Sequence, residues 1–589
     1  MVTVYDGATW LGAVTASGTT GIWSIRLGQL AVGAHSLTAT ATNALGDVSA
    51  TSSPLAFTVD APPVVGPATI TGSNYAETIT GTSGADSIVG LDGSDSIVGG
   101  NGADTLDGGY GYNTIDGGGG FNIASYASSH DGITGGLQYM LTGYSVGGGY
   151  LDDTLYNIQG VIGSAYRDSI SGDLNANLLS GGGGNDTVYG GGGADTLAGN
   201  TGDDQLEGDA GADLFRYLAR QFGHDVIRDF AAGDKLDVAA LGVSDLASLT
   251  PFMSQVGSDV VITLGYGGGG EQITLKGGSL AALTASSFIF NTAATPLVTS
   301  GTGLADVLFG GAGSDSLAGL NGADSLVGGS GADSLNGGGG DDQLRGGPGS
   351  DVFIYDVRQF GRDLIVDFTA GDRIDLSALG VSDLASLQPF MKQVGSDVVI
   401  TLGYYDAPEQ ITVKAATLAA LTASSFIFNT AATPVVASGT SLADVLFGGS
   451  GADSLTGFSG ADVLVGGSGG DTLKGGAGTD TLIGGAGADK FVFGLVADGA
   501  KTITDFSDAQ GDQLLISHTG FGGGLIAGAT LDASRLVNGS AATAAKGQFL
   551  FDGAGHLYWD VDGTGPAARV LIATLTGVTT LFAHEILIN

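Results

Sequence analysis

Aspartate recurs at a fixed spacing in four stretches of this chain, residues 72–125, 163–216, 301–354 and 439–492. Each stretch consists of six nine-residue repeats, of which GGSGADSLN and GGGGADTLA are typical. The sixth position of the repeat is Asp in 20 of the 24 copies. Stacking of such repeats would align their side chains in rows, so the pattern predicts rows of carboxylates that could bind cations.

The candidate metal ligands are therefore the aspartates at the sixth position, acting together with backbone carbonyl oxygens of the turns. Four copies carry another residue there: Glu77, Asn113, Asn122 and Asn177. The twenty candidate aspartates are Asp86, Asp95, Asp104, Asp168, Asp186, Asp195, Asp204, Asp213, Asp306, Asp315, Asp324, Asp333, Asp342, Asp351, Asp444, Asp453, Asp462, Asp471, Asp480 and Asp489.

The other positions of the repeat predict how these carboxylates are held. The eighth position is apolar in all 24 copies, and the glycines before the Asp permit positive φ angles and close backbone approach. Each repeat is thus a turn followed by a short strand with one inward side chain. A single repeat cannot bury that side chain alone, whereas stacked coils bury a continuous column, as in a solenoid.

The charge balance indicates which cation would fit. The chain has 60 acidic and 19 basic residues and a formal charge of −41, so too few Lys and Arg are present to neutralise the rows. Stacked strands place neighbouring aspartates roughly 4.8 Å apart, where unpaired carboxylates repel. Calcium accepts six to eight oxygen ligands in irregular geometry, whereas magnesium requires a stricter octahedron and retains its waters. We therefore expect calcium.

These repeats resemble GGxGxDxUx, the calcium-binding nonapeptide of the RTX (repeats-in-toxin) family, which forms parallel β-rolls. The resemblance covers the four stretches and implies that two repeats form one coil, with ions between stacked turns. Six repeats would then hold about four ions and four stretches about sixteen, whose charge of about +32 offsets most of the −41. Glu77, Asn113 and Asn122 are expected to mark incomplete or empty sites. The implied pairs are Asp306 with Asp324, Asp315 with Asp333, Asp324 with Asp342, and Asp333 with Asp351.

Between the stretches lies a duplicated module. Residues 224–296 recur as residues 362–434, with 55 of 73 positions identical at an offset of 138. Alternating strands, a short helix that Ser244 could cap, and a strand pair are expected in each copy. These modules resemble the antiparallel β-caps of RTX rolls, and an open roll end needs such a cover. Carboxylates at the roll–cap junction could bind a further calcium or form turns: Asp225, Asp229, Asp234, Asp363, Asp367 and Asp372.

The two ends of the chain differ from the repeats. Residues 1–62 alternate apolar and polar residues and resemble a bacterial immunoglobulin-like module that lacks its first strands, so we expect the natural chain to extend upstream. The final residues, LTGVTTLFAHEILIN, resemble the uncleaved export signal of type I secreted proteins, and they could equally be a last edge strand.

Composition excludes several functional classes. The absence of cysteine excludes disulfides, cysteine zinc sites and cysteine nucleophiles, and the shortage of basic residues argues against nucleic-acid binding. No apolar run is long enough for a transmembrane segment. Two segments match catalytic motifs only superficially. GGSGG at 466–470 fits the serine-hydrolase motif G-x-S-x-G but lies in a repeat turn, and HEILI at 584–588 lacks the second histidine of the zinc-protease motif H-E-x-x-H. We therefore expect no enzyme in these residues.

The sequence predicts an all-β fold of parallel β-rolls alternating with antiparallel caps, plus a partial immunoglobulin-like sandwich. The expected domains are the sandwich at 1–62, roll 1 at 63–216 with a connecting segment at 126–162, cap 1 at 217–296, roll 2 at 297–354, cap 2 at 355–434, roll 3 at 435–492, and a C-terminal cap with the export signal at 493–589.

The resemblance implies a calcium-binding structural region of a secreted bacterial cell-surface protein, of surface-layer or adhesin type, that folds on calcium after export. Two alternatives are a non-catalytic region of a secreted protease, lipase or polysaccharide epimerase with its catalytic domain upstream, and a carbohydrate-binding surface module. The implied location is extracellular or on the cell surface. Besides calcium, the expected partners are other copies of the chain, in a lattice or rod, or cell-surface polysaccharide.

Overall fold

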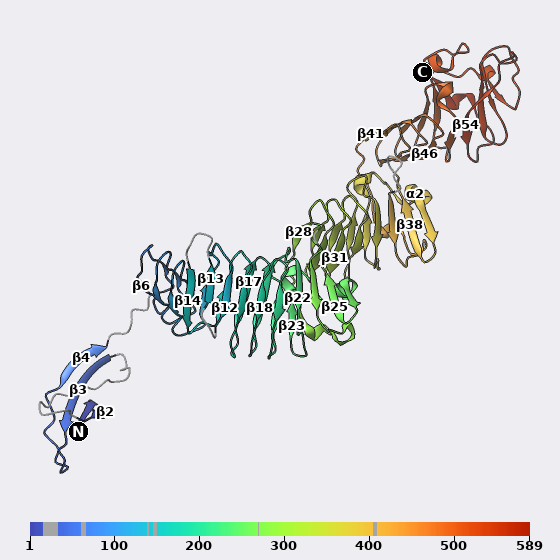
Figure 1. Ribbon diagram of the computed structural model, residues 1–589. Helices are drawn as coiled ribbons and strands as arrows, with labels where there is room; N and C mark the ends of the chain where they lie inside the picture. Colours follow the sequence, from blue (N-terminus) through green and yellow to red (C-terminus); the bar gives the residue numbers. More distant parts are fainter. Residues whose placement is uncertain (16–32, 60–65, 138–140, 145–149, 269, 404–408) are drawn as a thin grey trace. The chain divides into compact units, whose positions relative to one another are not determined.

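A computed structural model describes residues 1–15, 33–59, 66–137, 141–144, 150–268, 270–403 and 409–589 (Figure 1). The chain divides into two compact units, residues 1–182 and 183–589, which are described separately. Nearly all regular structure in the described residues is β, which confirms the predicted fold class. Three helices of four residues each occur in those residues: α1 (Leu246–Leu249), α2 (Leu384–Leu387) and α3 (His518–Phe521).

The N-terminal segment forms one antiparallel sheet with strand order β2-β1-β3-β4. Residues 16–32, where further strands of the predicted sandwich would fall, lie outside the described residues, so the sandwich remains a prediction. The strands are β1 (Val2–Asp6), β2 (Thr9–Val14), β3 (Gly33–Ala41) and β4 (Leu55–Val59).

The rest of the first unit is the beginning of roll 1, in which short strands alternate between two parallel sheets. Outside the connecting segment each strand pairs with the strand 18 residues later, as Thr69 pairs with Ser87, so two repeats form one coil. One sheet contains β5 (Thr69–Thr71), β7 (Ser87–Val89), β9 (Thr105–Asp107), β11 (Ile123–Ser125), β15 (Gly160–Ile162) and β17 (Leu178–Gly183). The other contains β6 (Thr78–Thr80), β8 (Ser96–Val98), β10 (Thr114–Asp116), β14 (Tyr150–Tyr156), β13 (Leu141–Tyr144), β12 (Ile133–Gly136) and β16 (Ser169–Ser171).

The connecting segment interrupts only the second of these sheets. There β12, β13 and β14 insert as antiparallel neighbours, while β12 pairs with β16 and β14 pairs with β10 in parallel. In the first sheet, β11 pairs directly with β15 in parallel. The insertion therefore preserves the direction of the roll, as expected for one interrupted solenoid.

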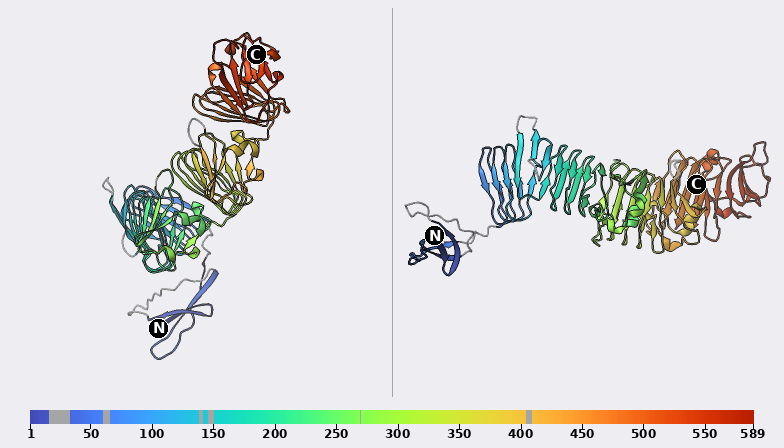
Figure 2. Two further views of the ribbon diagram at one scale, coloured as in Figure 1. Left: turned by 90° about the vertical axis from the view of Figure 1, so that its right-hand side faces the viewer. Right: turned by 60° about the horizontal axis from the view of Figure 1, so that its bottom comes forward.

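The second unit contains coils of the same construction (Figures 1 and 2). The inward leucines of roll 2, such as Leu308, Leu326 and Leu344, are at most 1 % exposed. The end of roll 1 contains β18 (Thr187–Tyr189), β19 (Thr196–Thr201), β20 (Gln205–Glu207) and β21 (Leu214–Arg216). Roll 2 contains β28 (Val298–Ser300), β29 (Val307–Gly311), β30 (Ser316–Ala318), β31 (Ser325–Gly329), β32 (Ser334–Asn336), β33 (Gln343–Arg345) and β34 (Val352–Ile354). Roll 3 contains β41 (Val436–Ser438), β42 (Val445–Gly449), β43 (Ser454–Ser459), β44 (Val463–Ser468), β45 (Thr472–Ala477), β46 (Thr481–Ala486) and β47 (Lys490–Phe493).

The two cap modules are mixed rather than purely antiparallel, which corrects the expectation from sequence. Their first strands add one more parallel coil to the roll, and only the following hairpin is antiparallel. Cap 1 contains β22 (His224–Ile227), β23 (Lys235–Asp237), β24 (Met253–Val256), β25 (Asp259–Thr263), β26 (Gln272–Leu275) and β27 (Phe288–Ile289). Cap 2 contains β35 (Arg362–Ile365), β36 (Arg373–Asp375), β37 (Met391–Val394), β38 (Asp397–Thr401), β39 (Gln410–Val413) and β40 (Phe426–Ile427).

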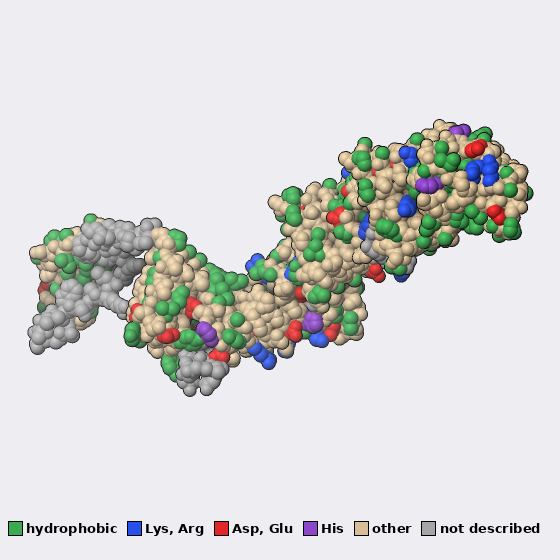
Figure 3. All heavy atoms as spheres, turned by 90° about the horizontal axis from the view of Figure 1, so that it is seen from above, with side chains coloured by type: hydrophobic (Ala, Val, Ile, Leu, Met, Phe, Trp, Pro, Cys, Tyr) green, Lys and Arg blue, Asp and Glu red, His purple; other side chains and the backbone are tan. Residues whose placement is uncertain are grey.

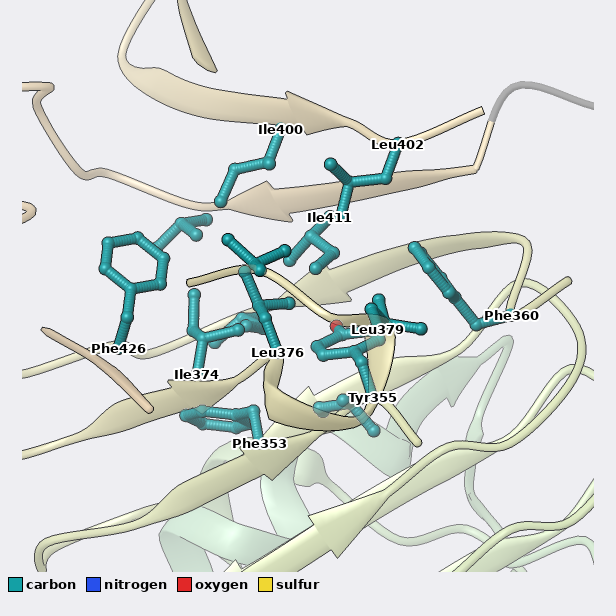
Figure 4. Packing of buried hydrophobic residues seen from close by; sticks show 14 of the residues in the cluster. Phe353, Tyr355, Phe360, Ile374, Leu376, Leu379, Ile400, Leu402, Ile411 and Phe426 are labelled. Atoms are coloured by element: carbon teal, nitrogen blue, oxygen red, sulfur yellow. The ribbon is translucent and has the colours of Figure 1, made fainter. Parts of the chain in front are cut away.

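The core of cap 2 continues the apolar column of roll 2 without a break (Figure 4). Phe353, from the last repeat, and Ile374, from the added coil, pair across β34 and β36. Ile400 and Ile411 come from the hairpin β38–β39 and are fully buried. The cap thus covers the apolar end that the roll would otherwise expose to water.

Helix α1 begins one residue later than expected. The Oδ1 atom of Asp245 accepts the N–H of Ser248 at 2.8 Å, so Asp245 is the N-cap, whereas the hydroxyl of Ser244 contacts the carboxylate of Asp245. A carboxylate at the N-cap satisfies a free N–H group of the first turn.

The C-terminal cap extends both sheets of roll 3 through parallel and antiparallel pairs, so it too is mixed rather than purely antiparallel. Its last strand lies between two others, parallel to one and antiparallel to the other, so it is not the edge strand considered from sequence. The strands are β48 (Lys501–Ile503), β49 (Gln513–Ile516), β50 (Ala529–Thr530), β51 (Leu536–Asn538), β52 (Gln548–Phe551), β53 (His556–Asp560), β54 (Val570–Leu575) and β55 (Ile586–Ile588).

Candidate metal centre

The structure stacks the repeat aspartates in buried columns. In roll 2 the backbone N–H of Asp306 donates to Oδ1 of Asp324, and that of Asp324 donates to Oδ1 of Asp342, both at 2.8 Å. Each aspartate therefore uses one carboxylate oxygen to join two coils. The same bond, at 2.7 to 3.0 Å, joins Asp86 to Asp104, Asp186 to Asp204, Asp195 to Asp213, Asp315 to Asp333, Asp333 to Asp351, Asp444 to Asp462, Asp453 to Asp471, Asp462 to Asp480 and Asp471 to Asp489.

The second carboxylate oxygen, Oδ2, is a buried acceptor that most columns leave without a hydrogen bond. A buried anionic oxygen with no donor is costly unless a cation neutralises it. Among the described residues, this holds for Oδ2 of Asp95, Asp104, Asp204, Asp225, Asp315, Asp324, Asp333, Asp342, Asp351, Asp363, Asp453, Asp462, Asp471 and Asp489.

Glycine at the first repeat position leaves room for an ion beside these oxygens. A Cβ atom added to Gly448 would lie 2.6 Å from Oδ2 of Asp453 and 2.6 Å from the carbonyl oxygen of Gly466. A carboxylate of one coil and a carbonyl of the next coil thus border the same small space. Hard oxygen donors of these two kinds are the ligands that calcium prefers, so the residues present fit calcium.

The protonation energetics of the columns agree with this assignment. Burial, followed by the charges of the neighbouring aspartates, raises the pKa of Asp324 and Asp333 to about 7. Burial likewise raises the pKa of Asp342 and Asp351 to about 6. Ionising these groups near neutral pH therefore costs free energy unless a cation is bound. On the face drawn in Figure 3 few acidic side chains are visible, although the chain contains 60.

The first aspartate of each stretch has a different partner. In roll 2, Thr302 donates both its N–H, at 2.6 Å, and its hydroxyl, at 3.0 Å, to Oδ2 of Asp306. Equivalent hydroxyl donors are Thr82 for Asp86, Ser164 for Asp168 and Thr440 for Asp444. These hydroxyl donors could have been predicted from the sequence, because each is a Thr or Ser at the second position of a repeat, where most repeats have glycine.

The junction aspartates do not gather into one site per cap. Oδ1 of Asp225 accepts the N–H of Asp204, and Oδ1 of Asp234 accepts the N–H of Asp213, both at 3.0 Å, so each ends a different column. Asp229 instead accepts the N–H groups of Gly208 and Asp209. Asp363, Asp372 and Asp367 repeat these three roles in cap 2. Within the part of the chain that the structure describes, Glu207, Asp209 and Asp229 form a group of three carboxylates whose oxygens all lie within 4.8 Å of one another.

Two further column aspartates, Asp153 and Asp512, were missed in the sequence. Asp153, in the inserted hairpin, accepts the N–H of Asn113 and the hydroxyl of Tyr126, both at 3.0 Å, and burial raises its pKa to about 6. Asp512 accepts the N–H of Asp489 at 3.0 Å. Asp512 could have been found, because GDQL at 511–514 matches GDKL at 233–236. Asp153 is not separated from the repeat aspartates of roll 1 by a multiple of nine residues, so the repeat pattern does not predict it.

Asn113 and Asn122, in the first stretch, retain the hydrogen bond between coils that aspartate makes but not its negative charge. Oδ1 of Asn113 accepts the N–H of Asp95 at 2.9 Å, and its amide donates to the carbonyl of Gly109 at 3.4 Å. Asn122 likewise accepts from Asp104 and donates to the carbonyl of Asn157. An amide N–H₂ group therefore stands where aspartate has an anionic oxygen. This agrees with the expectation of incomplete ion sites, which remains a prediction.

A comparison with known families matches the RTX calcium-binding nonapeptide repeat to the four stretches. The matched residues are 71–106, 98–120, 162–197, 189–217, 300–335, 318–353, 438–473 and 465–499. No curated protein matches the chain. Within the described residues, no helix is both long and apolar enough to span a membrane.

Solved structures with similarity to the chain include two repeat subunits of a mannuronan C5-epimerase of Azotobacter vinelandii. The AlgE6R3 subunit is 31 % identical over 21 % of this chain and 78 % of that chain, with a TM-score of 0.18. The AlgE6R2 subunit is 30 % identical over 23 % of this chain and 94 % of that chain, with a TM-score of 0.19.

The extracellular lipase LipA of Serratia marcescens is 25 % identical over 38 % of this chain and 40 % of that chain, with a TM-score of 0.17. The repeat match and the stacked aspartates coincide in the same four stretches. In these stretches the chain therefore belongs to the RTX family of calcium-binding nonapeptide repeat proteins.

Proposed function

We propose that this chain is a calcium-binding structural segment of a secreted bacterial cell-surface protein, of surface-layer or adhesin type, that folds when it meets calcium outside the cell. The observation that carries the proposal is the set of buried carboxylate columns, in which Oδ2 atoms such as those of Asp324, Asp333 and Asp471 accept no hydrogen bond from the residues that the structure describes. Without a cation these columns oppose folding, and with one they connect successive coils.

The proposed trigger is the difference in calcium concentration across the cell envelope. Extracellular calcium sites have dissociation constants on the order of 10⁻⁴ to 10⁻³ M. Such sites are empty in the cytosol, where the chain would stay unfolded and could pass through a type I secretion channel. Outside the cell, ion binding adds to the free energy of folding.

A structural role is further supported by the duplicated cap. The second copy, residues 362–434, retains 55 of 73 residues of the first and sits at the same place after a roll. Repetition of a whole roll–cap unit lengthens the protein without adding a new kind of site, which suits a spacer. We propose on this basis that the segment is not itself catalytic.

Calcium titration of the full chain tests this proposal. We expect the β signal in circular dichroism to be largely lost in EGTA and restored by millimolar calcium, with about sixteen ions bound per chain by native mass spectrometry. Spectra that do not respond to calcium would refute ion-coupled folding. Electron microscopy of the calcium-bound protein then tests the surface role, for which we expect rods or ordered sheets rather than isolated compact particles.

A further inference from the structure

The last coil of each roll has one equivalent position in all three rolls. It lies 21 residues after the aspartate of the second-last repeat (Asp204, Asp342 or Asp480) and is occupied by Asp225, Asp363 and Lys501. In rolls 1 and 2 the carboxylate at this position accepts the N–H of the preceding aspartate and extends the column. In roll 3 Lys501 replaces this aspartate, so the last position of the equivalent column is positively charged.

Lys501 is buried, with only 2 % of the side chain exposed. Its Nζ donates to the carbonyl oxygens of Gly476, Gly478 and Asp498 at 2.6, 2.8 and 2.7 Å. Nζ also lies 3.0 Å from Oδ2 of Asp480, which is fully buried. Three carbonyls use the three protons of the ammonium group, and the carboxylate balances its charge.

These partners are turn groups of the kind expected to bind calcium. Gly476, Gly478 and Asp480 are the second, fourth and sixth residues of one nonapeptide, 475–483. The lysine ammonium therefore occupies the oxygen-lined space at the end of this column. A divalent ion placed there would lie against a buried positive charge, and the two cations would repel each other at low dielectric.

The residue facing this position changes together with it. Tyr217 and Tyr355 lie near Asp225 and Asp363 at the ends of rolls 1 and 2, and burial together with those aspartate charges raises the pKa of both tyrosines. The equivalent residue in roll 3 is Phe493, which is buried. Loss of the hydroxyl accompanies loss of the carboxylate, so the site as a whole differs.

We infer that the Lys501 ammonium is a built-in cation that replaces calcium at the last position of its column, so that roll 3 stays joined to the C-terminal cap without calcium. This rests on calcium binding by the other repeats. The inference distinguishes the end of roll 3 around residues 475–503, which needs one ion fewer because Lys501 fills the Asp480 column, from the equivalent residues 337–365 of roll 2, where both columns depend on the ion.

Hydrogen exchange of the full chain, read by mass spectrometry of peptides, tests the inference. In EGTA we expect peptides from 475–503 to exchange at least about tenfold more slowly than the equivalent peptides from 337–365. Equal loss of protection in both segments would overturn the inference. If the 337–365 peptides do not respond to calcium at all, the proposed function falls as well, so the two failures are distinguishable.

Two reciprocal variants sharpen the test. Lys501→Asp should make protection of 475–503 depend on calcium and add one bound ion per chain by native mass spectrometry. The double change Asp363→Lys with Tyr355→Phe should remove one ion and retain protection of 337–365 in EGTA. Lys490→Asp, an exposed residue of β47, is the matched charge control and should change neither. An unchanged ion count in both reciprocal variants would overturn the inference.

Discussion

Replacing two column aspartates by asparagine should have opposite effects with and without calcium. The variant is Asp324→Asn with Asp333→Asn in roll 2. Asn113 and Asn122 show that an amide fits this position, since Oδ1 still accepts the N–H of the preceding coil and the amide donates to a carbonyl. The substitution thus retains the hydrogen bond and removes only the charge.

The size of the effect without calcium follows from the pKa shifts. The pKa of Asp324 and Asp333 is raised to about 7, from an ordinary 3.8. Each pKa unit corresponds to about 1.4 kcal/mol, and we halve the total to allow for solvent screening, which leaves about 2 kcal/mol per residue. Since the folded pKa is raised, this cost is absent below about pH 4 and complete above about pH 7. In EGTA at pH 8 the variant should therefore be more stable.

With calcium the sign reverses. Each of the two aspartates borders two expected ions, and a site filled at one hundred times its dissociation constant contributes about 2.7 kcal/mol. The variant removes one of the two carboxylates from each of these four sites, and if each site loses half of its contribution, roll 2 should be destabilised by about 5 kcal/mol at about 10 mM calcium. Hydrogen exchange of strands β30 to β33 gives the local free energy of opening, which avoids assuming one transition for the whole chain.

The matched control is Asp383→Asn in cap 2. Oδ1 of Asp383 accepts the N–H of Ser386 at 2.8 Å at the start of α2, and asparagine caps helices as well as aspartate does. This control also replaces an aspartate by asparagine, but outside the columns, so it should change the stability of the protein little with or without calcium. If the double variant shifts stability in the same direction with and without calcium, the assignment of these carboxylates to ions is wrong.

Further predictions concern the turns, pH and the C-terminus. Leu320 and Phe458 occupy the second repeat position with φ of 80° and 71°, so Leu320→Gly or Phe458→Gly should each raise stability in calcium by about 1 kcal/mol, measured by thermal unfolding. Calcium affinity, measured by titration calorimetry, should fall as pH drops from 7 to 5, because protons compete for carboxylates with raised pKa such as Asp471, at about 7. Removal of residues 575–589 should block export, whereas Ile586→Asp, which disrupts buried β55 at full length, should not; retention of both variants would reject the signal assignment.

The regular part of this fold could be predicted because one constraint repeats. A coil must bury its eighth residue and join its sixth to the next coil, so Leu326 and Asp324 follow from the nine-residue phase alone. The hairpin containing Asp153 could not be predicted in the same way, because its contact with Asn113 spans 40 residues without a repeat. Antiparallel caps were predicted because their strands alternate like hairpins, yet β22 and β23 belong to the parallel stack.

The ends of each column depart from the repeat pattern because an end coil lacks one neighbour. At the first coil of roll 2, Thr302 donates an N–H and a hydroxyl to Asp306. At the last coil the next aspartate comes from the cap at a longer spacing, 21 residues for Asp363. In roll 3 the corresponding position is occupied by Lys501, whose ammonium group lies beside the last aspartate of the column, Asp480, in place of an ion. The repeats therefore set where ions can bind, and the residues just outside them set how many positions need an ion.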